Sequence, residues 1–152
     1  MSYADTMRYE QMILEVETTP ASGTYAALCG LIDVTINRTA SIDTTEVPPC
    51  NDESLPLSIE RAVRSQEVTI SATGVWALQS HETIMDWWYG GGTLNIRLRN
   101  AKVEADGATG DTETEAGPAI LVSLNNSRTK GQKVTAELEI NFDGVPTRTA
   151  KV

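Results

Sequence analysis

The sequence is poor in the residues from which most catalytic and metal sites are built. Its 152 residues include one histidine and two cysteines. A single histidine, His81, excludes a histidine-rich metal centre, and Cys29 and Cys50 are too far apart to form a C-x-x-C pair. No G-x-S-x-G motif is present, so a serine nucleophile with His81 as its base is not indicated. We therefore expect no enzyme activity, no metal and no cofactor.

Basic residues are also scarce, with 12 lysines and arginines against 21 acidic residues and a formal net charge of −9. They are scattered along the chain, so stable binding of nucleic acid is disfavoured, whereas passing contact with DNA is compatible with this charge. No apolar run approaches the roughly 20 residues that span a membrane. The N-terminal stretch lacks a hydrophobic secretion signal. We expect a soluble protein, made in a reducing cytoplasm, with both cysteines as free thiols.

The sequence does contain several stretches in which apolar and polar residues alternate. In residues 133–142, apolar side chains at every second position from Val134 to Phe142 oppose polar ones that include Glu137 and Glu139. Successive side chains of a strand point to opposite faces, so this pattern predicts a half-buried strand with one apolar and one polar face. Related patterns predict strands at 9–17, 25–37, 39–47, 67–76, 93–99 and 119–125, and a short edge strand in 144–152.

One helix is predicted over residues 81–89. Ser80 is placed to serve as its N-cap, and Glu82 lies in the first turn, where the helix dipole favours an acid. Gly90 supplies the stop. A single helix among many strands predicts a mainly β fold, in the form of an antiparallel β-sandwich or barrel with one flanking α-helix. We expect residues 1–152 to form a single domain.

The apolar stripe of this helix is Ile84, Trp87 and Trp88, which we predict to pack the helix against the sheet. Consecutive aromatic residues of a helix cannot all face inward. Either Trp88 or Tyr89 is therefore expected to be exposed to solvent or to lie at a subunit contact.

Two segments depart from the strand pattern. Residues 48–66 contain three prolines, which exclude a regular central strand, and the spacing of Ile59, Ala62 and Val63 is that of a helical turn. The apolar residues of this long segment indicate that it docks either on its own domain or on a neighbouring subunit. Residues 100–117 are rich in acids and glycines without the spacing of a calcium-binding loop, and are predicted to be a solvated acidic loop.

The order of these elements resembles that of the tail tube (major tail) proteins of long-tailed phages and gene-transfer agents. The likeness covers most of residues 9–142. It is carried by the apolar run 27–31 that leads into 33–37, the hydroxyl- and acid-rich 41–46, the long segment 48–66, the strand 68–74, and the capped helix with its Trp pair and triple glycine before 94–98.

This resemblance implies a structural virion protein of a siphovirus-like particle, assembled in the host cytoplasm and not attached to a membrane. It implies hexameric rings of the chain that stack into a hollow tube, with tail terminator, tape measure and distal tail proteins as partners and DNA passing transiently through the lumen. The residues that would then face the lumen are Asp33, Thr35, Glu137 and Glu139. Those of the loop between rings would be Leu55, Leu57, Ile59 and Val63.

Other interpretations of the same residues stay open. Glu137 and Glu139 could simply lie on a solvated face. A ring protein of the type VI secretion kind shares the implied fold. A carbohydrate-binding β-sandwich would instead use Trp87, Trp88 or Tyr89 as a stacking platform.

Overall fold

A computed structural model of the protein describes residues 2–19 and 21–152. The helical elements are the 3-10 turn η1 (Tyr9–Gln11) and the helices α1 (Leu78–Gly90) and α2 (Ala101–Asp106). The strands are β1 (Met12–Glu17), β2 (Tyr25–Ala27), β3 (Leu31–Val47), β4 (Ser58–Val75), β5 (Leu94–Asn100), β6 (Thr112–Ser127), β7 (Thr135–Phe142) and β8 (Thr147–Ala150). All pair antiparallel in the order β2-β1-β5-β6-β7-β4-β3, with β8 beside β6, so the mainly β fold class is confirmed.

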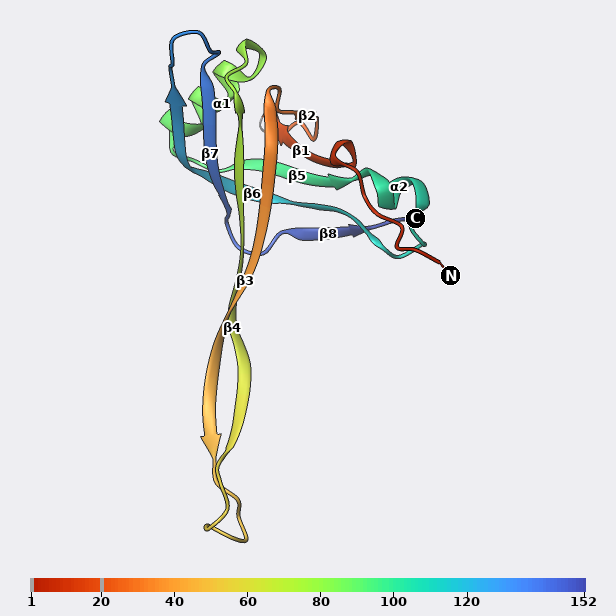
Figure 1. Ribbon diagram of the computed structural model, residues 1–152, viewed down its shortest axis with the longest axis vertical. Helices are drawn as coiled ribbons and strands as arrows, with labels where there is room; N and C mark the ends of the chain where they lie inside the picture. The colour runs from red at the N-terminus through yellow and green to blue at the C-terminus, as the bar shows by residue number, and fades with distance from the viewer. Residues whose placement is uncertain (1, 20) are drawn as a thin grey trace.

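The sheet turns back on itself at β6. The first half of β6 pairs with β5 and β8, and its second half, from Ala119, pairs with β7. A bulge between Leu121 and Ser123 lies just beyond the last pairing with β5. Because a bulge bends its strand, β6 can pass from one layer to the other. Figure 1 shows the result, in which β1, β5 and β8 run across the direction of β3, β4 and β7.

The core lies between these two layers. Every second residue of the central strands points inward, as the alternation predicted, and α1 covers one end of the sandwich. The indole N–H of Trp87 donates to the carbonyl oxygen of Ala119 at 3.3 Å, which satisfies its one polar group inside the core. The largest fully buried side chains are Val16 of β1, Ile70 of β4, Ile96 of β5 and Ile140 of β7.

The helix α1 is longer than predicted and begins differently. Its N-cap is Ala77, which offers no side-chain hydrogen bond, so the prediction that Ser80 caps the helix is wrong. Ser80 is instead buried within the first turn, and its hydroxyl accepts the backbone N–H of Cys29 at 2.8 Å. This bond ties α1 to the turn before β3. The helix ends at Gly90, and Gly91 takes the left-handed conformation, with a φ of 65°.

The predicted packing stripe of α1 needs one correction. Ile84 and Trp87 are buried against the sheet, but the side chain of Trp88 is 44% exposed and that of Tyr89 is 77% exposed. Successive residues of a helix are about 100° apart, so when Trp87 faces the sheet, Trp88 points to the side and Tyr89 away from it. The two outer rings meet edge to face with their centroids 5.1 Å apart.

Several predicted boundaries also change. The strand predicted over 25–37 is broken at Gly30, whose φ of 88° makes a turn, and the strand that follows runs to Val47 without the expected gap. The predicted strand 9–17 begins as the turn η1. The acidic segment 100–117 is not simply a loop, since it holds α2 and the start of β6. The Asn100 side chain caps α2 by accepting the N–H of Val103 at 3.1 Å.

The long segment 48–66 is only partly a loop. Residues 58–66 belong to β4 and pair with β3, so the helical turn predicted around Ile59 and Val63 is wrong. The backbone groups of these residues find partners across the ladder, which removes the need for a helix. All three prolines lie in residues 48–57, where the chain turns between the two strands.

Candidate functional site

The outer surface of β3, β4, β7 and the second half of β6 is mainly polar, with the exposed Ile120 and Val75 as apolar exceptions. The pairing register aligns Asp33, Thr73, Glu137 and Asn125 in one row across the four strands. The four sequence-predicted residues Asp33, Thr35, Glu137 and Glu139 thus lie on one face in two neighbouring rows. We call this surface the polar face; its other members are Thr35, Ser71, Glu139 and Ser123 in a second row and Asn37, Thr69 and Asn141 in a third.

Sequence reasoning did not name the other seven members of the polar face as site residues. They are hydroxyl and amide residues, which are common on the exposed side of any strand and do not stand out singly. The signal that could have found them is the alternation itself, once the four strands are known to be neighbours. Pairing β4 between β3 and β7 places Ser71 and Thr73 between the acids of the outer strands.

The polar face carries charge of one sign. Asp33, Glu137 and Glu139 are its three carboxylates, and no lysine or arginine is among its eleven members. Glu137 and Glu139 are about 7 Å apart along the strand, and Asp33 lies two strands from Glu137, about 10 Å away. These separations are too large for chelation of one ion and are close to the roughly 8 Å over which physiological salt screens a charge. The face therefore presents a diffuse negative field.

Both margins of the polar face are free strand edges. In the part of the chain that the structure describes, β3 pairs only with β4, and residues 120–127 pair only with β7. Each margin holds a bulge, with Ile32 in one and Val122 in the other, and both side chains are exposed. Unpaired N–H and C=O groups at a strand edge readily pair with another strand. The layer can therefore be extended on both sides by further copies.

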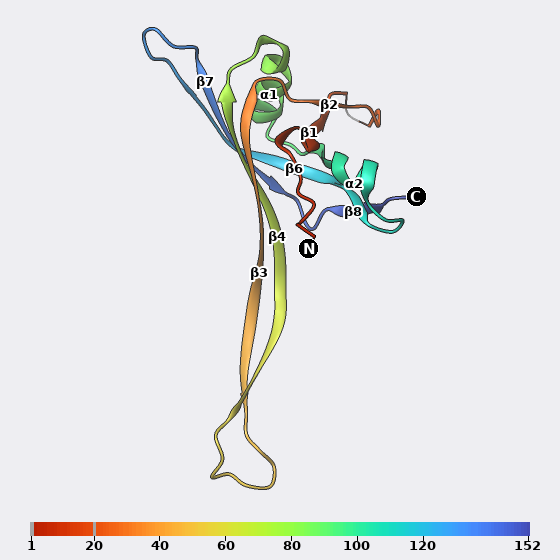
Figure 2. The ribbon, with the colours of Figure 1, turned by 45° about the vertical axis from the view of Figure 1, so that its right-hand side comes forward.

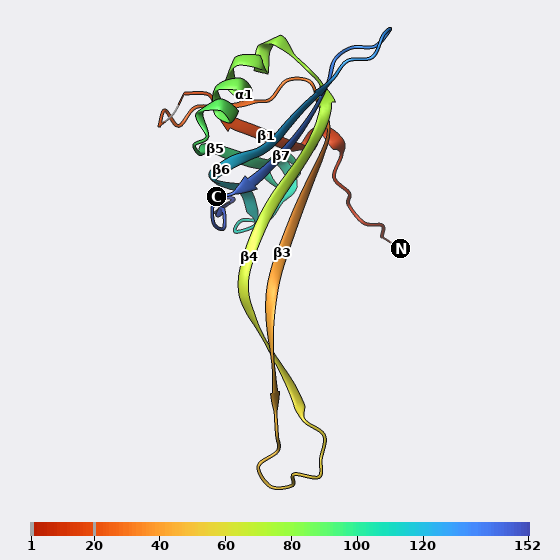
Figure 3. The same ribbon diagram turned by 90° about the vertical axis from the view of Figure 1, so that its left-hand side faces the viewer.

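Beyond the body, β3 and β4 continue as a long two-stranded arm (Figures 1 and 2). We define the arm as residues 39–67 and its tip loop as residues 48–57. The ladder runs from the pair Thr39–Glu67 to the pair Val47–Ser58, and Figure 3 shows it projecting far from the sandwich. Almost every side chain of the arm is exposed. At its base Arg38 donates to the carboxylate of Glu115 at 2.7 Å, which links the arm to β6.

Apolar side chains gather on the arm although it has no core. Ile42 lies directly opposite Val63, and Ile59 follows on the same face of β4. These three, with Leu55 and Leu57 of the tip loop, are between 47% and 57% exposed. Of the five, only Ile42 was missed from the sequence, where its place in the alternation of 39–47 was the available signal. A row of half-exposed apolar side chains on a thin ribbon is suited to burial against another surface.

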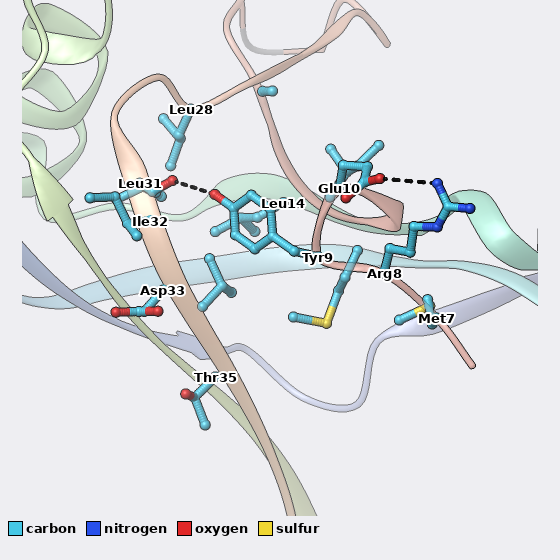
Figure 4. A pocket seen from close by; sticks show the side chains of 14 residues that line it. Met7, Arg8, Tyr9, Glu10, Leu14, Leu28, Leu31, Ile32, Asp33 and Thr35 are labelled. Atoms are coloured by element: carbon cyan, nitrogen blue, oxygen red, sulfur yellow. Dashed lines mark hydrogen bonds and ion pairs between the residues drawn. The ribbon is translucent and has the colours of Figure 1, made fainter.

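A groove of about 600 Å³ separates the N-terminal segment from β3 (Figure 4). Met7, Met12, Leu31 and Val34 give it an apolar lining. The hydroxyl of Tyr9 donates to the carbonyl oxygen of Leu31 at 3.2 Å across the groove. Its charged groups, such as the Arg8–Glu10 pair at 3.8 Å, lie at the exposed rim. The groove brings together no nucleophile and base.

The histidine and the buried carboxylate of Glu15 have structural partners. The ring nitrogen Nδ1 of His81 accepts the indole N–H of Trp76 at 3.0 Å, which fixes the helix against the strand before it. The buried carboxylate of Glu15 accepts two hydrogen bonds from Arg97, at 3.0 and 2.9 Å, and Arg97 stacks over the ring of Tyr25. Among residues 2–19 and 21–152 no three His, Cys, Asp or Glu side chains are grouped to hold a metal ion. None of the helices in this part is long and apolar enough to cross a membrane.

The chain is thus a folded-over antiparallel sheet with free strand edges, one acidic face and a projecting arm (Figure 1). The chain belongs to the phage tail tube protein family, whose model matches residues 6–148. The resemblance inferred from the order of the elements is thereby confirmed. The protein is a structural component of the virion tail.

Solved tail structures share the fold. The tail of an empty gene transfer agent (GTA) particle, refined with C6 symmetry, is 15% identical with a TM-score of 0.72, and the match covers 95% of this chain and 100% of that one. A chain of the native GTA virion is also 15% identical, with a TM-score of 0.70 and the same coverage. The SPP1 tail tube is 12% identical with a TM-score of 0.70, covering 97% of this chain and 81% of that one. No curated protein matches the chain.

Proposed function

We propose that copies of this chain join side by side into hexameric rings, and that the rings stack into a hollow tube through which DNA passes. The observation that carries this proposal is the polar face with a free strand edge on each side. A sheet with two free edges is an aggregation liability in a monomer, and closing the sheet between copies removes both edges. The GTA tail that shares the fold was refined with C6 symmetry, which supports six copies in a ring.

The size of such a ring suits its cargo. Joining β3 of one copy to β6 of the next continues the four-stranded layer, so six copies make a barrel of roughly two dozen strands. At about 4.8 Å between strands, the circumference is about 115 Å and the diameter about 37 Å, and strand tilt widens it further. A barrel of this width, with the side chains of the polar face inside, leaves room for a DNA duplex.

The charge of the polar face suits passage and disfavours retention. Asp33, Thr35, Glu137 and Glu139 would face the lumen. Tight DNA binding depends on lysine and arginine contacts that release counterions from the phosphates, and the polar face has no such residue. Its carboxylates repel phosphate only within about 8 Å at physiological salt, so they keep DNA from adhering without closing the channel.

The arm would join one ring to the next. A contact between different surfaces of two identical copies leaves the complementary surfaces free, so it propagates into a filament. Burial of Ile42, Leu55, Leu57, Ile59 and Val63 against the neighbouring ring would stabilise this contact. In the particle, tail terminator and distal tail proteins would meet the two ends of the tube, and the tape measure protein would occupy the lumen during assembly.

Electron microscopy of a variant with a shortened arm tests the proposal. Residues 43–62 are replaced by Asn-Gly, which joins the directly opposed Ile42 and Val63 through a two-residue hairpin turn. The body should stay folded, because the deleted residues contribute nothing to the core. The wild-type protein should form tubes as its concentration rises, whereas the variant should stop at rings or smaller species.

The shortened variant tests the role of the arm, and the wild-type protein tests the formation of a tube. Long tubes from the shortened variant would refute the role of the arm. A wild-type protein that stays monomeric at every concentration would refute the tube itself. Circular dichroism of both proteins provides the control for folding.

A further inference from the structure

The turn between β6 and β7 is basic, in a chain that is otherwise strongly acidic. Arg128, Lys130 and Lys133 are exposed, and residues 126–136 contain no acid. Gly131, with a φ of 86°, and the N–H of Gln132, which donates to the Thr129 carbonyl at 3.1 Å, close the turn. The interpretation that the basic residues are evenly scattered is therefore wrong at this point, because three of the 12 lie within one turn. We call residues 128–133 the basic turn.

The distal arm has the opposite charge. The distal arm, residues 43–62, contains five acids against one arginine, Arg61, which lies opposite Thr44. All five side chains are exposed, and Asp52 accepts hydrogen bonds from the hydroxyl and the backbone N–H of Ser54, which lower the pKa of Asp52 and keep it charged. The five acids of the distal arm are Asp43, Glu46, Asp52, Glu53 and Glu60.

The two charged segments lie at opposite ends of the molecule. Figure 1 shows the tip loop at the bottom of the long axis and the β6–β7 turn at the top, with the sandwich between them. One copy therefore cannot bring its own distal arm to its own basic turn. The ion pairs within the described chain involve other residues, such as Arg38 with Glu115 and Lys102 with Asp106. Both ends thus present unpaired charge to a second molecule.

We propose that the acidic distal arm of one copy docks on the basic turn of a copy in the adjacent ring. This rests on the proposed tube and names the surface that receives the arm. Repeating copies head to tail along the long axis brings the acidic end of each toward the basic end of the next. Complementary charge orients the approach and selects the axial partner, while the apolar residues of the tip loop supply burial.

DNA is the rival occupant of the basic turn, and the neighbouring charges disfavour it. Glu137 and Glu139 follow Lys133 along the same hairpin and belong to the acidic polar face. Phosphates that approached the turn from the lumen would meet these carboxylates. The acids of the arm carry a complementary charge and, through the exposed tip loop, an apolar surface as well.

Charge reversal at each end, and at both ends together, tests the proposal. The first variant carries Arg128→Glu, Lys130→Glu and Lys133→Glu, and the second carries Glu46→Lys, Asp52→Lys and Glu53→Lys. Each should raise the protein concentration needed for tube growth by about tenfold or more, since several exposed ion pairs become repulsive together. The combined variant restores opposite charges and the original net charge, so its tubes should grow near the wild-type concentration.

Tube growth by the first variant at the wild-type concentration would overturn the proposal, including the case in which only binding of added DNA changes. A combined variant that fails to recover would overturn it as well. If the wild-type protein forms no tubes, the failure lies with the proposed function itself. The substituted residues are exposed, and circular dichroism checks that each variant is folded.

Crosslinking supplies a direct measure of proximity. Cys50 lies exposed in the tip loop, so Lys130→Cys in a Cys29→Ser background places one thiol at each end of the molecule. A bis-maleimide should link assembled tubes of this protein into a ladder of multimers on a denaturing gel. Variants that keep only Cys50, or only the cysteine at position 130, are the controls. Thr109→Cys with Cys50 in the same background should give no ladder. Absence of a ladder from the first protein would overturn the proposal.

Discussion

Among single residues, Gly74 is the position where the fold leaves no room for a side chain. It lies where the end of β4 meets the start of β3. A Cβ atom on Gly74 would be 2.1 Å from the carbonyl oxygen of Gly30 and 2.7 Å from the Cα of Leu31. Both neighbours are backbone atoms held in place by the N–H of Val75, which donates to the same Gly30 oxygen at 2.9 Å. The close approach of β3 and β4 at this point therefore requires a residue without a side chain.

The substitution Gly74→Ala should lower the free energy of unfolding by about 2–3 kcal/mol, because the backbone must shift to admit the methyl group. Gly92→Ala is the matched control, since a Cβ there meets nothing within 4 Å. Urea unfolding followed by tryptophan fluorescence measures both. Equal stability of the two variants would show that the strands can separate at this point without cost.

Glu104 couples the short helix α2 to β5. Its carboxylate accepts two hydrogen bonds from Arg99, at 2.7 and 3.0 Å, and this pairing lowers the pKa of Glu104 below its ordinary value of 4.5. A carboxyl whose pKa is lowered by folding stabilises the protein above its unfolded pKa. That contribution is lost as the pH falls through the lower folded value.

The variant Glu104→Gln should therefore be less stable than the wild type by about 1 kcal/mol at pH 7. The difference should shrink as the pH falls from 4.5 through the folded pKa of Glu104, where the wild-type carboxyl also becomes neutral. Urea unfolding at several pH values between 7 and 3 follows the difference. A difference that stays constant over this range would mean that packing, and not charge, holds α2 in place.

At the scale of elements, the sequence predicted the strands in which apolar and polar residues alternate. It missed a strand that can be recognised only from its pairing with another strand. Strict alternation in 133–142 is a local property, so it located β7 and its two faces. The strand at 58–66 was missed because prolines nearby argued against it and its pairing with β3 is not visible locally. The helix α2 was missed because it is only six residues long, although Asn100 offered a capping signal.

The candidate site, too, could be predicted only in part from the sequence. Asp33, Thr35, Glu137 and Glu139 could be assigned to polar faces from alternation alone, but their meeting on one face required the strand order. The resemblance suggested an apolar contact loop over residues 48–66. In the structure, residues 58–66 belong to a two-stranded ribbon, and only residues 48–57 form the loop at its tip. The basic turn was missed although Arg128, Lys130 and Lys133 lie within six consecutive residues, because its position at one end of the molecule is visible only in the structure (Figure 1).

At the scale of the whole molecule, the sign of the polar face is the property to test. Replacing Glu137 and Glu139 by lysine changes its charge from three negative to one positive in total, since Asp33 remains. In the proposed tube this converts a repelling lumen into one that binds phosphate. Assembly should be largely intact, because both side chains are exposed on the outside of the core.

Particles built from this variant should therefore deliver DNA less efficiently, and its tubes should bind added DNA with an affinity that falls steeply with salt. Delivered DNA per particle is the measurement. Glu82→Lys with Asp86→Lys is the control, because it makes the same charge change on α1, away from the polar face. Delivery that is unaltered by the Glu137 and Glu139 substitutions would place these residues outside the lumen.

The arm also has a consequence for how tubes begin. A two-stranded ribbon that packs on nothing is at best marginally stable in water, so a free subunit samples frayed forms of its arm. Ordering the arm on a neighbour costs conformational entropy, which the first few rings must overcome with few contacts. An existing tube end offers a full ring of receiving surfaces at once. Growth from a template should thus outpace spontaneous nucleation, which would keep free subunits from polymerising before a tail has been started.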